Sequence, residues 1–236
     1  MAEDESTVYA PAEDTQLVLE GLKVRAGERA VELGTGRGDI ALELARRGAR
    51  VEATDVNPAA VAVASARAQA EGLPVRFFVG DLFAPCKGAF DLVVFNPPYL
   101  PTGPQDRVAG ALNAAFDGGA DGLAVTRRFL AALPLRLKAG GRALTVVSSL
   151  SPWGAFLAAV PAGFEARVLS RARFDFEELR LVEVSRAPSR PKRKGGARSP
   201  RGPTRARSGS PRAKGKAAKG RSRLPRKGGA ARPPSR

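Results

Sequence analysis

Short apolar strands alternate with helical patterns along the first hundred residues, and this alternation limits the possible folds more than any other feature. Strands that alternate with helices of this length form βαβ units with right-handed crossovers. The sequence therefore predicts an α/β fold whose mainly parallel sheet is covered by helices on both faces. The predicted strands are 29–33, 50–55, 75–80 and 90–95, and the predicted helices are 38–48 and 57–72.

Patterns on either side of this region complete the predicted sheet. One helix is expected before it, and another, which Pro134 interrupts, is expected after it. A fifth strand follows, and two segments with strict apolar–polar alternation predict an antiparallel hairpin at the edge of the sheet. The ranges are 11–24 and 124–137 for the helices and 142–149, 164–174 and 179–185 for the strands. The sequence therefore predicts a seven-stranded, mainly parallel sheet with an antiparallel carboxyl-terminal hairpin.

The composition changes abruptly near residue 186. Residues 186–236 hold 19 of the 39 Lys and Arg and none of the 23 Asp and Glu, and Leu224 is their single large apolar residue. Such a segment cannot bury enough apolar surface to offset the entropy cost of ordering it. We predict a folded domain at 1–185 and a disordered basic tail at 186–236.

The absence of His and the presence of a single Cys exclude several kinds of chemistry. The chain has no His and one Cys, Cys86, which excludes an intramolecular disulfide, a multi-cysteine metal site and His-dependent catalysis. We therefore expect no metal in the site. The chain also has no apolar run of about 18 residues and opens with the acidic MAEDES, so we expect a soluble, cytoplasmic protein with no membrane contact.

The stretch VELGTGRG (31–38) places Glu32 near a strand end, and Gly34, Gly36 and Gly38 open the following helix. Glycines in this position let the backbone turn tightly and approach a ligand closely. A dinucleotide fingerprint would need a glycine at position 39, which is Asp39, and the loop lacks the Lys-Ser/Thr of a P-loop. The loop favours a nucleoside-bearing ligand without phosphates, and the alternative is tight strand-to-helix packing.

Aspartates follow the next two strands. Asp55 ends one of them, about 20 residues after the glycines, where an acidic residue can accept hydrogen bonds from both ribose hydroxyls. Its alternative role is to cap a helix, which Asn57 already does. Asp81, in VGDLF, has the alternative of a turn residue. Three acidic strand ends without a cation for phosphate favour a ligand that is itself cationic.

The apolar strand 90–95 stops at NPPY, residues 96–99. Because Pro cannot donate to a β-ladder and fixes its own φ, the chain must leave the sheet at Pro97 and Pro98. Asn96 therefore stands at a strand's carboxyl end in a rigid turn, and ligands bind at this edge of open α/β sheets.

Taken together, VELGTGRG, Asp55, GDL and NPPY resemble a class I S-adenosylmethionine-dependent methyltransferase of the HemK-like branch, which methylates glutamine in peptide-chain release factors. The opening YAPAEDTQLVL and FDGGADG (116–122) resemble the short, HemK2-type members of archaea and eukaryotes. The resemblance covers residues 8–185 and implies the Rossmann-like class I methyltransferase fold. NPPY is shared with adenine and guanine methyltransferases, so the YxPxEDT opening discriminates better.

The resemblance also implies a role for each matching residue. It implies that Asp55 binds the ribose of the cofactor and that Asp81 and the Leu82 amide bind its adenine. The amide group of the substrate is held by Asn96 and the Pro97 carbonyl, with Tyr99 stacked on it and Pro98 beside it. The remaining cofactor residues are Thr15, Glu32, Gly34, Gly36 and Asn96.

This arrangement makes chemical sense without a histidine. An amide nitrogen is a poor nucleophile because its lone pair is delocalised, and two acceptors on its N–H bonds can aim that lone pair at the sulfonium methyl. The barrier falls through positioning and matched dipoles. The glycine-rich connection 100–122 is long enough to be a substrate lid, in which Asp117, Gly118 and Gly119 shape a turn. Trp153 is expected to pack in the core or against the hairpin.

Three functions remain open at this point. The preferred one is methylation of the glutamine in a release-factor Gly-Gly-Gln loop, with a small activating subunit as a possible partner. The second is methylation of an exocyclic amine in nucleic acid, assisted by the tail, and the third is a non-catalytic nucleic-acid-binding protein. Basic tails without aromatic residues are typical of arms that bind RNA, ribosomes or DNA through phosphates. The alternative for the tail at 186–236 is an appendage with no defined partner.

Overall fold

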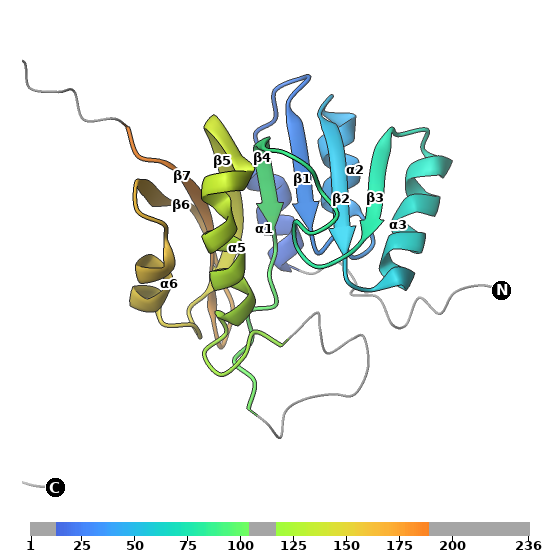
Figure 1. The fold of residues 1–236 in the computed structure, drawn as a ribbon. Coiled ribbons are helices and arrows are strands. Elements are labelled where there is room, and N and C mark those ends of the chain that lie inside the picture. The colour runs from blue at the N-terminus through green and yellow to red at the C-terminus, as the bar shows by residue number, and fades with distance from the viewer. Residues whose placement is uncertain (1–12, 104–116, 189–236) are drawn as a thin grey trace, which may run out of the picture. The chain divides into compact units, whose positions relative to one another are not determined.

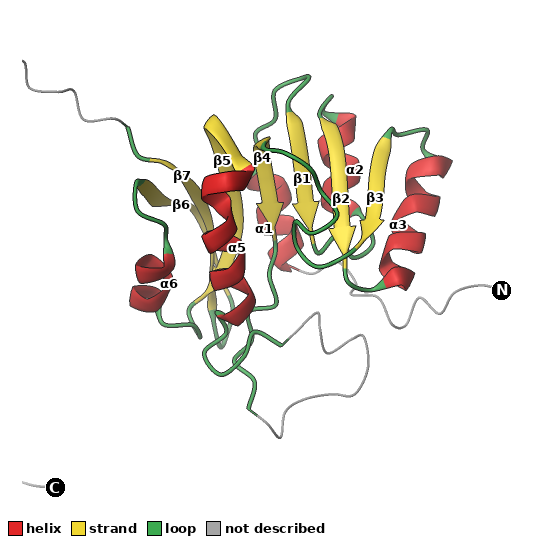
Figure 2. Ribbon diagram, in the orientation of Figure 1, coloured by secondary structure: helices red, strands yellow, loops and turns green. Residues whose placement is uncertain are grey.

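The computed structural model describes residues 13–103 and 117–188. These residues form one seven-stranded sheet with helices on both faces (Figures 1 and 2). Of the basic tail predicted at 186–236, Arg186 is the last residue of β7, and residues 189–236 lie outside the described residues, as does the centre of the predicted lid. Among the helices of the described part, none is both long and apolar enough to cross a bilayer.

The strand order is β3-β2-β1-β4-β5-β7-β6, in which the first five strands are parallel and β7 pairs antiparallel with both β5 and β6. The predicted parallel sheet and carboxyl-terminal hairpin are thus confirmed. The strands are β1 (Arg29–Leu33), β2 (Arg50–Asp55), β3 (Val75–Val79), β4 (Phe90–Phe95), β5 (Leu137–Ser148), β6 (Phe164–Arg173) and β7 (Glu178–Arg186).

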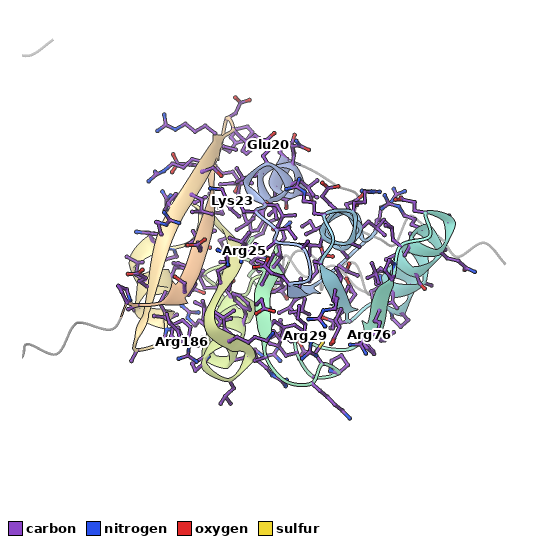
Figure 3. The ribbon with its side chains drawn as sticks, turned by 90° about the horizontal axis from the view of Figure 1, so that it is seen from above. Glu20, Lys23, Arg25, Arg29, Arg76 and Arg186 are labelled. Carbon is purple, nitrogen blue, oxygen red and sulfur yellow. The ribbon has the colours of Figure 1, made fainter. Side chains whose placement is uncertain are left out.

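The register brings the carboxyl ends of the parallel strands to one edge. Leu33, the last residue of β1, lies opposite Thr54 of β2 and Phe95 of β4, and Asp55 lies opposite Val79. The loops that follow β1, β2, β3 and β4 therefore meet at this edge, which Figure 1 shows at the lower end of the sheet. Figure 3 looks onto the opposite edge, where these strands begin.

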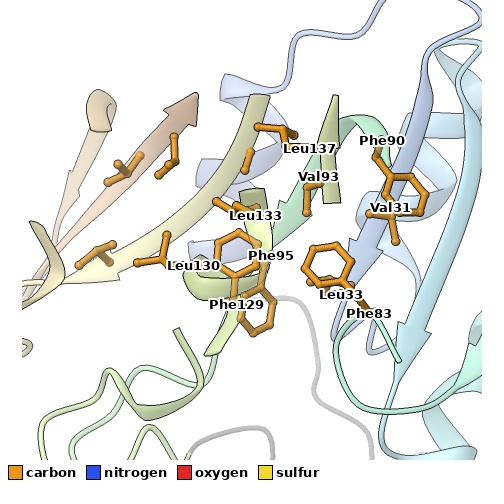
Figure 4. Close-up of a cluster of buried hydrophobic side chains, with 14 of the residues drawn as sticks. Val31, Leu33, Phe83, Phe90, Val93, Phe95, Phe129, Leu130, Leu133 and Leu137 are labelled. Carbon is orange, nitrogen blue, oxygen red and sulfur yellow. The ribbon is translucent and has the colours of Figure 1, made fainter. Parts of the chain in front are cut away.

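The central strands read as continuous apolar runs because they are buried on both faces. Along β4, Val93 and Phe95 point to one core cluster, whereas Leu92 and Val94 point to the other. The first cluster is aromatic, and the ring of Phe129 lies 5.1 Å from that of Phe95 (Figure 4). The second packs under α1 and α2.

The helices cover the sheet from both sides. Three of them, α1 (Glu13–Gly21), α2 (Asp39–Arg46) and α3 (Pro58–Ala70), lie on one face, and α5 (Ala124–Arg136) and α6 (Trp153–Ala159) lie on the other. Asn57 caps α3 by accepting a hydrogen bond from the Ala59 amide at 3.0 Å, as its position before Pro58 predicts.

One predicted strand began too late, and one helix was not predicted. β5 begins at Leu137, directly after α5, and not at 142, because its first residues pair with Phe90 across a bulge in the ladder. Helix α6 was not predicted, since its seven residues are too few to show a helical period. Trp153 begins α6 and stacks on Phe156 with the ring centroids 5.1 Å apart, which agrees with the expected packing role.

Candidate active site

The glycine-rich loop after β1 is tied to the end of β2. Gly34 and Gly36 have φ values of 66° and 52°, which side chains rarely allow. The Gly36 amide donates a hydrogen bond of 2.9 Å to the Asp55 carboxylate, and the Thr35 amide donates one of 2.9 Å to the Thr54 carbonyl. The predicted glycine loop and the predicted aspartate are thereby held as one unit.

The glycines of this loop differ in what surrounds them. A Cβ on Gly38 would come within 3.0 Å of the Ala64 Cβ on α3, so this glycine is required for helix packing. A Cβ on Gly34 would meet Phe95 at 3.6 Å and the Asn96 carbonyl at 3.9 Å, which are ordinary contacts. Gly34 is also exposed, so its backbone can be approached from solvent beside the Asn96 turn.

Glu32 lies beneath this loop and is 2 % exposed. Its Oε2 atom accepts hydrogen bonds from the Thr35 hydroxyl at 2.6 Å and from the Ala41 amide at 2.9 Å. Burial raises the pKa of Glu32 to about 8, although these two hydrogen bonds oppose the shift. In this structure the carboxyl group organises the glycine loop and the start of α2.

Asp55 is directed into the same loop from the end of β2. One carboxylate oxygen accepts the Gly36 bond, and the other accepts a bond of 2.9 Å from the Asn57 amide. Burial raises the pKa of Asp55, while the hydrogen bonds from Asn57, Gly36 and Val56 lower it. Asp55 is therefore not the helix cap, a role that Asn57 fills.

Asp81 stands next to a strained residue. Leu82 has a φ of 46°, which is costly for a residue with a Cβ, and its carbonyl accepts a hydrogen bond of 2.9 Å from the Thr54 hydroxyl. The Asp81 carboxylate is half exposed and forms an ion pair with Arg128 of α5. The acidic side chain and the adjoining backbone are thus both held in place at the same edge.

Asn96 follows directly on β4 and presents an unusual polar atom. Its side-chain oxygen Oδ1 is buried and has no hydrogen-bond partner among the described residues. A buried acceptor without a donor costs about 1–3 kcal/mol, so such atoms call for an explanation. The neighbouring Pro97 is buried and Pro98 half-buried, and neither can supply an N–H donor.

Tyr99 links the NPPY turn to the first helix. Its hydroxyl donates a hydrogen bond of 3.2 Å to Asp14, and the same carboxylate accepts a bond of 2.6 Å from the Thr15 amide. Asp14 and Thr15 are both buried. The last residues of the YxPxEDT opening, Glu13 to Thr15, are therefore brought to the carboxyl edge of the sheet, in the first turn of α1.

Residues 117–122, the described part of FDGGADG, also support this turn. The Gly118 amide donates to the Leu100 carbonyl at 3.0 Å, and Asp117 accepts a bond of 2.9 Å from the Gly119 amide, so the predicted turn is present. Gly122 has a φ of 72°, and a Cβ there would come within 3.0 Å of the Tyr99 carbonyl and the Ser151 hydroxyl. Only glycine fits beside this part of the NPPY turn.

The sequence-predicted residues thus meet at one edge, but four of their supports were not predicted. These are Asp14, Thr54, Arg128 and Ser151, each of which contacts a predicted residue through a hydrogen bond or an ion pair. Asp14 belongs to the YxPxEDT opening, and this motif could have indicated its role. The other three lie far along the chain from their partners, and no local pattern marks them.

Comparison with known proteins shows which family the chain resembles. Residues 10–166 match the family model described as "Methyltransferase small domain". A protein of Methanocaldococcus jannaschii that is named for N5-glutamine methylation of proteins is 38 % identical over 181 residues, which is 76 % of this chain and 92 % of that protein. The mouse "Methyltransferase HEMK2" is 37 % identical over 57 % of this chain and 68 % of its own length.

Bacterial relatives and solved structures extend the comparison. The "Release factor glutamine methyltransferase" of Geobacter sulfurreducens is 37 % identical over 57 % of this chain, which spans about half, 51 %, of that enzyme. The E. cuniculi Mtq2–Trm112 complex, described as methylating the translation termination factor eRF1, superposes with a TM-score of 0.62. That match covers 77 % of this chain and 99 % of the other at 24 % identity, so it bears on the fold.

Proposed function

The chain belongs to the methyltransferase small-domain family, as a HemK-like member, and from this we propose that it methylates the side-chain amide of a protein glutamine. The methyl donor is S-adenosyl-L-methionine, which class I methyltransferases use. The favoured substrate is the glutamine of a Gly-Gly-Gln motif in a peptide-chain release factor, in line with the names of the relatives.

One observation supports an amide substrate in particular. The buried Asn96 Oδ1 lacks a donor among the described residues, and a primary amide is a compact group with two N–H donors. One N–H satisfies Asn96 Oδ1, and the other is directed at the Pro97 carbonyl of the adjacent residue. Because binding would remove the desolvation cost of the unpaired oxygen, the site is complementary to an NH₂ group.

The residues around the glycine loop fit the methyl donor. Gly34 is exposed beside Asn96, and the acidic Asp55 and Asp81 stand at the ends of β2 and β3. We assign Asp55 to the ribose and Asp81 with the Leu82 amide to the adenine. Thr15, Glu32 and Gly36 complete the binding residues. When bound, S-adenosyl-L-methionine supplies an electrophilic methyl group on a cationic sulfur.

The chain's own residues position the nucleophile. Asn96 and Pro97 hold the amide N–H groups, so the nitrogen lone pair points along the line of attack. Tyr99 limits the orientation of the amide plane, and its hydroxyl is fixed by Asp14. Methyl transfer would form an N–C bond and break the methyl–sulfur bond, and the two acceptors, Asn96 and the Pro97 carbonyl, would stabilise the positive charge that the nitrogen gains. The nitrogen then loses one proton to water, so no histidine is needed.

The function is tested by incubating the purified protein with methyl-labelled S-adenosyl-L-methionine and a release factor. We expect label on the motif glutamine, located by mass spectrometry, and none on a release factor whose glutamine is replaced by glutamate. Asn96→Ala should lower turnover by orders of magnitude while cofactor affinity stays within about tenfold, since the contact is made with the reacting group.

Thr145→Val is the matched control for this substitution. The Thr145 hydroxyl is also buried and without a partner among the described residues, and Thr145 lies opposite Phe95 on the neighbouring strand. We expect turnover to remain unchanged in this variant. Equal losses in both variants would mean that the effect comes from core packing near β4, and the assigned role of Asn96 would be wrong.

A small activating subunit is the second part of the proposal. The Mtq2 structure is that of a complex with Trm112. In this chain β3 forms one edge of the sheet, and Val79 at its end is 52 % exposed, so an additional chain can lie along it. Val79→Lys should abolish stimulation by such a subunit and leave the basal rate intact. Full stimulation of this variant would place the subunit elsewhere.

A labelling experiment with a whole-cell extract separates the other two functions. Label in RNA or DNA, with none in a release factor, would favour nucleic-acid methylation. Failure to bind S-adenosyl-L-methionine in calorimetry would favour the non-catalytic protein.

A further inference from the structure

Cationic side chains gather at the edge of the sheet opposite the candidate active site. Figure 3 looks onto this edge and shows Lys23, Arg25, Arg29, Arg76 and Arg186 there. Strands β1, β2 and β3 begin at this edge, and β7 ends there. We call this the amino-edge surface. Its cations are Lys23, Arg25, Arg29, Arg76, Lys87, Arg136, Arg142 and Arg186.

The gathering is not a result of overall basicity. Residues 1–185 contain slightly more Asp and Glu than Lys and Arg, so cations at one edge imply acids elsewhere. Several acids lie at the opposite edge, where Asp14, Asp55, Asp81 and Asp117 stand around the loops after the strands, and Asp81 is paired with Arg128. The gathering of cations is therefore local to the amino-edge surface.

Two of the carboxylates at the amino-edge surface, Glu52 and Glu28, are shared between cations, whereas Asp91 pairs with Lys138. Glu52 is 3 % exposed and pairs with both Arg29, at 2.7 Å, and Arg76. Glu28 pairs with Arg142 at 2.8 Å and lies 3.9 Å from Arg25. Each of these two glutamates thus faces two guanidinium groups and can neutralise one of them. A positive charge is left over at both places.

Other cations here are anchored by neutral groups. The Arg136 guanidinium donates to the carbonyls of Cys86 at 2.8 Å and Gly88 at 3.4 Å. Arg186 donates to the Pro134 carbonyl at 2.8 Å and lies over the Phe164 ring at 4.9 Å. Carbonyls and rings fix a guanidinium without cancelling its charge. These side chains are therefore preorganised positive groups.

The chemistry of the surface fits phosphates better than a lipid surface. Guanidinium groups bind phosphate oxygens in pairs, and the side chains of Arg25 and Arg76 are 81 % and 68 % exposed. Binding to a membrane would need several apolar anchors as well. In the described part, the exposed large apolar residue at this edge is Leu135, in the last turn of α5, and one such residue is too few to anchor a membrane.

We propose that the amino-edge surface binds the phosphate backbone of structured RNA. The choice of RNA rests on the proposed function, because a release factor acts within a machine built of RNA. The surface carries this proposal by itself, through the Lys and Arg residues named above. Since the surface lies opposite the catalytic edge, RNA and the protein substrate bind at the same time.

The experiment compares two full-length triple variants that lose the same charge. Lys23→Gln, Arg25→Gln and Lys87→Gln alter the amino-edge surface at exposed side chains. Arg167→Gln, Arg171→Gln and Arg173→Gln on β6 are the matched control, since these side chains are also exposed. Affinity for a ribosomal RNA fragment is measured from low to high salt, together with the unfolding temperature of each variant.

We expect the amino-edge variant to bind RNA about tenfold more weakly at physiological salt, with a logarithmic salt slope smaller by roughly 2, because three phosphate contacts are lost. The control variant should keep the wild-type slope. Equal slopes in the two variants would overturn the proposal, as would tighter binding to DNA of equal length or to anionic vesicles than to RNA.

Methyl transfer to an isolated release factor keeps the two proposals apart. Both variants should retain the wild-type rate in this assay, because none of the six residues lies in the candidate active site. If the wild-type protein did not methylate the factor, the proposed function would fail, and the RNA measurement would still decide the role of the surface.

Discussion

Glu32 is the single residue whose ionisation bears most on the stability of the domain. It is buried, and its pKa of about 8 stands far above the ordinary 4.5. Between these two values the unfolded chain has lost the proton and the folded chain still holds it. The free energy of unfolding therefore falls as the pH rises, by up to about 1.4 kcal/mol for each pH unit.

Glu32→Gln should remove this dependence. The amide oxygen of glutamine can still accept from the Thr35 hydroxyl and the Ala41 amide, but the group cannot ionise. We expect the variant to gain stability relative to the wild type between pH 5 and pH 8 in denaturant titrations. Parallel stability curves across this range would show that Glu32 is ionised in the folded protein throughout.

At the scale of elements, the NPPY turn depends on a glycine that follows it by more than twenty residues. Gly122→Ala should lower the free energy of unfolding by roughly 2–4 kcal/mol, because the new methyl group meets the Tyr99 carbonyl and the backbone is strained. Turnover should fall as well, since the displaced turn carries Asn96. Both quantities are measured on the same preparation.

Gly163→Ala is the control for this substitution. Gly163 has a φ of 79°, close to that of Gly122, and a Cβ there meets nothing within 4 Å. The control should show the conformational cost alone, about 1–2 kcal/mol, with unchanged turnover. A loss of activity equal to that of Gly122→Ala would contradict the role of the contact with Tyr99.

Elements were predictable where the period was long and the ends were marked. Asn57 before Pro58 announces α3, and the apolar run of β4 ends at Pro97. Helix α6 and the first residues of β5 were missed because their conformation depends on what they pack against and not on local pattern.

At the scale of the whole molecule, the parallel arrangement let the sequence predict which residues would share an edge. Parallel strands have their carboxyl ends at the same edge. The sequence therefore predicted one shared edge for Glu32, Asp55, Asp81 and Asn96. The ion pair of Arg128 with Asp81 depends instead on how α5 lies over the sheet. No spacing in the chain encodes that distance.

Ligand binding at this shared edge should stabilise the entire domain. At about 100 times its dissociation constant, S-adenosyl-L-homocysteine should add about 2.7 kcal/mol to the free energy of unfolding. Asp55→Ala should weaken binding at least tenfold and remove about half of that gain. Calorimetric titration and thermal unfolding, each compared with the variant's own ligand-free form, provide the measurement.

Asp91→Ala provides the comparison for this test. Asp91 is also a paired acid, bound to Lys138 at 2.7 Å, but it lies at the opposite edge of the sheet. Its removal should leave ligand affinity unchanged. If both variants bound the ligand normally, the assignment of Asp55 to the ribose would have to be abandoned.

The position of β7 in the strand order has a consequence for how the chain is made. The sheet ends in the order β5-β7-β6, so the strand that is synthesised last of the seven fills an interior place. Until Glu178–Arg186 has left the ribosome, β5 keeps an open, apolar edge, and β6 has not yet met the strand with which it pairs. Completion of the domain therefore waits for its final strand, and the nascent chain is most exposed to mispairing and to chaperones in this interval.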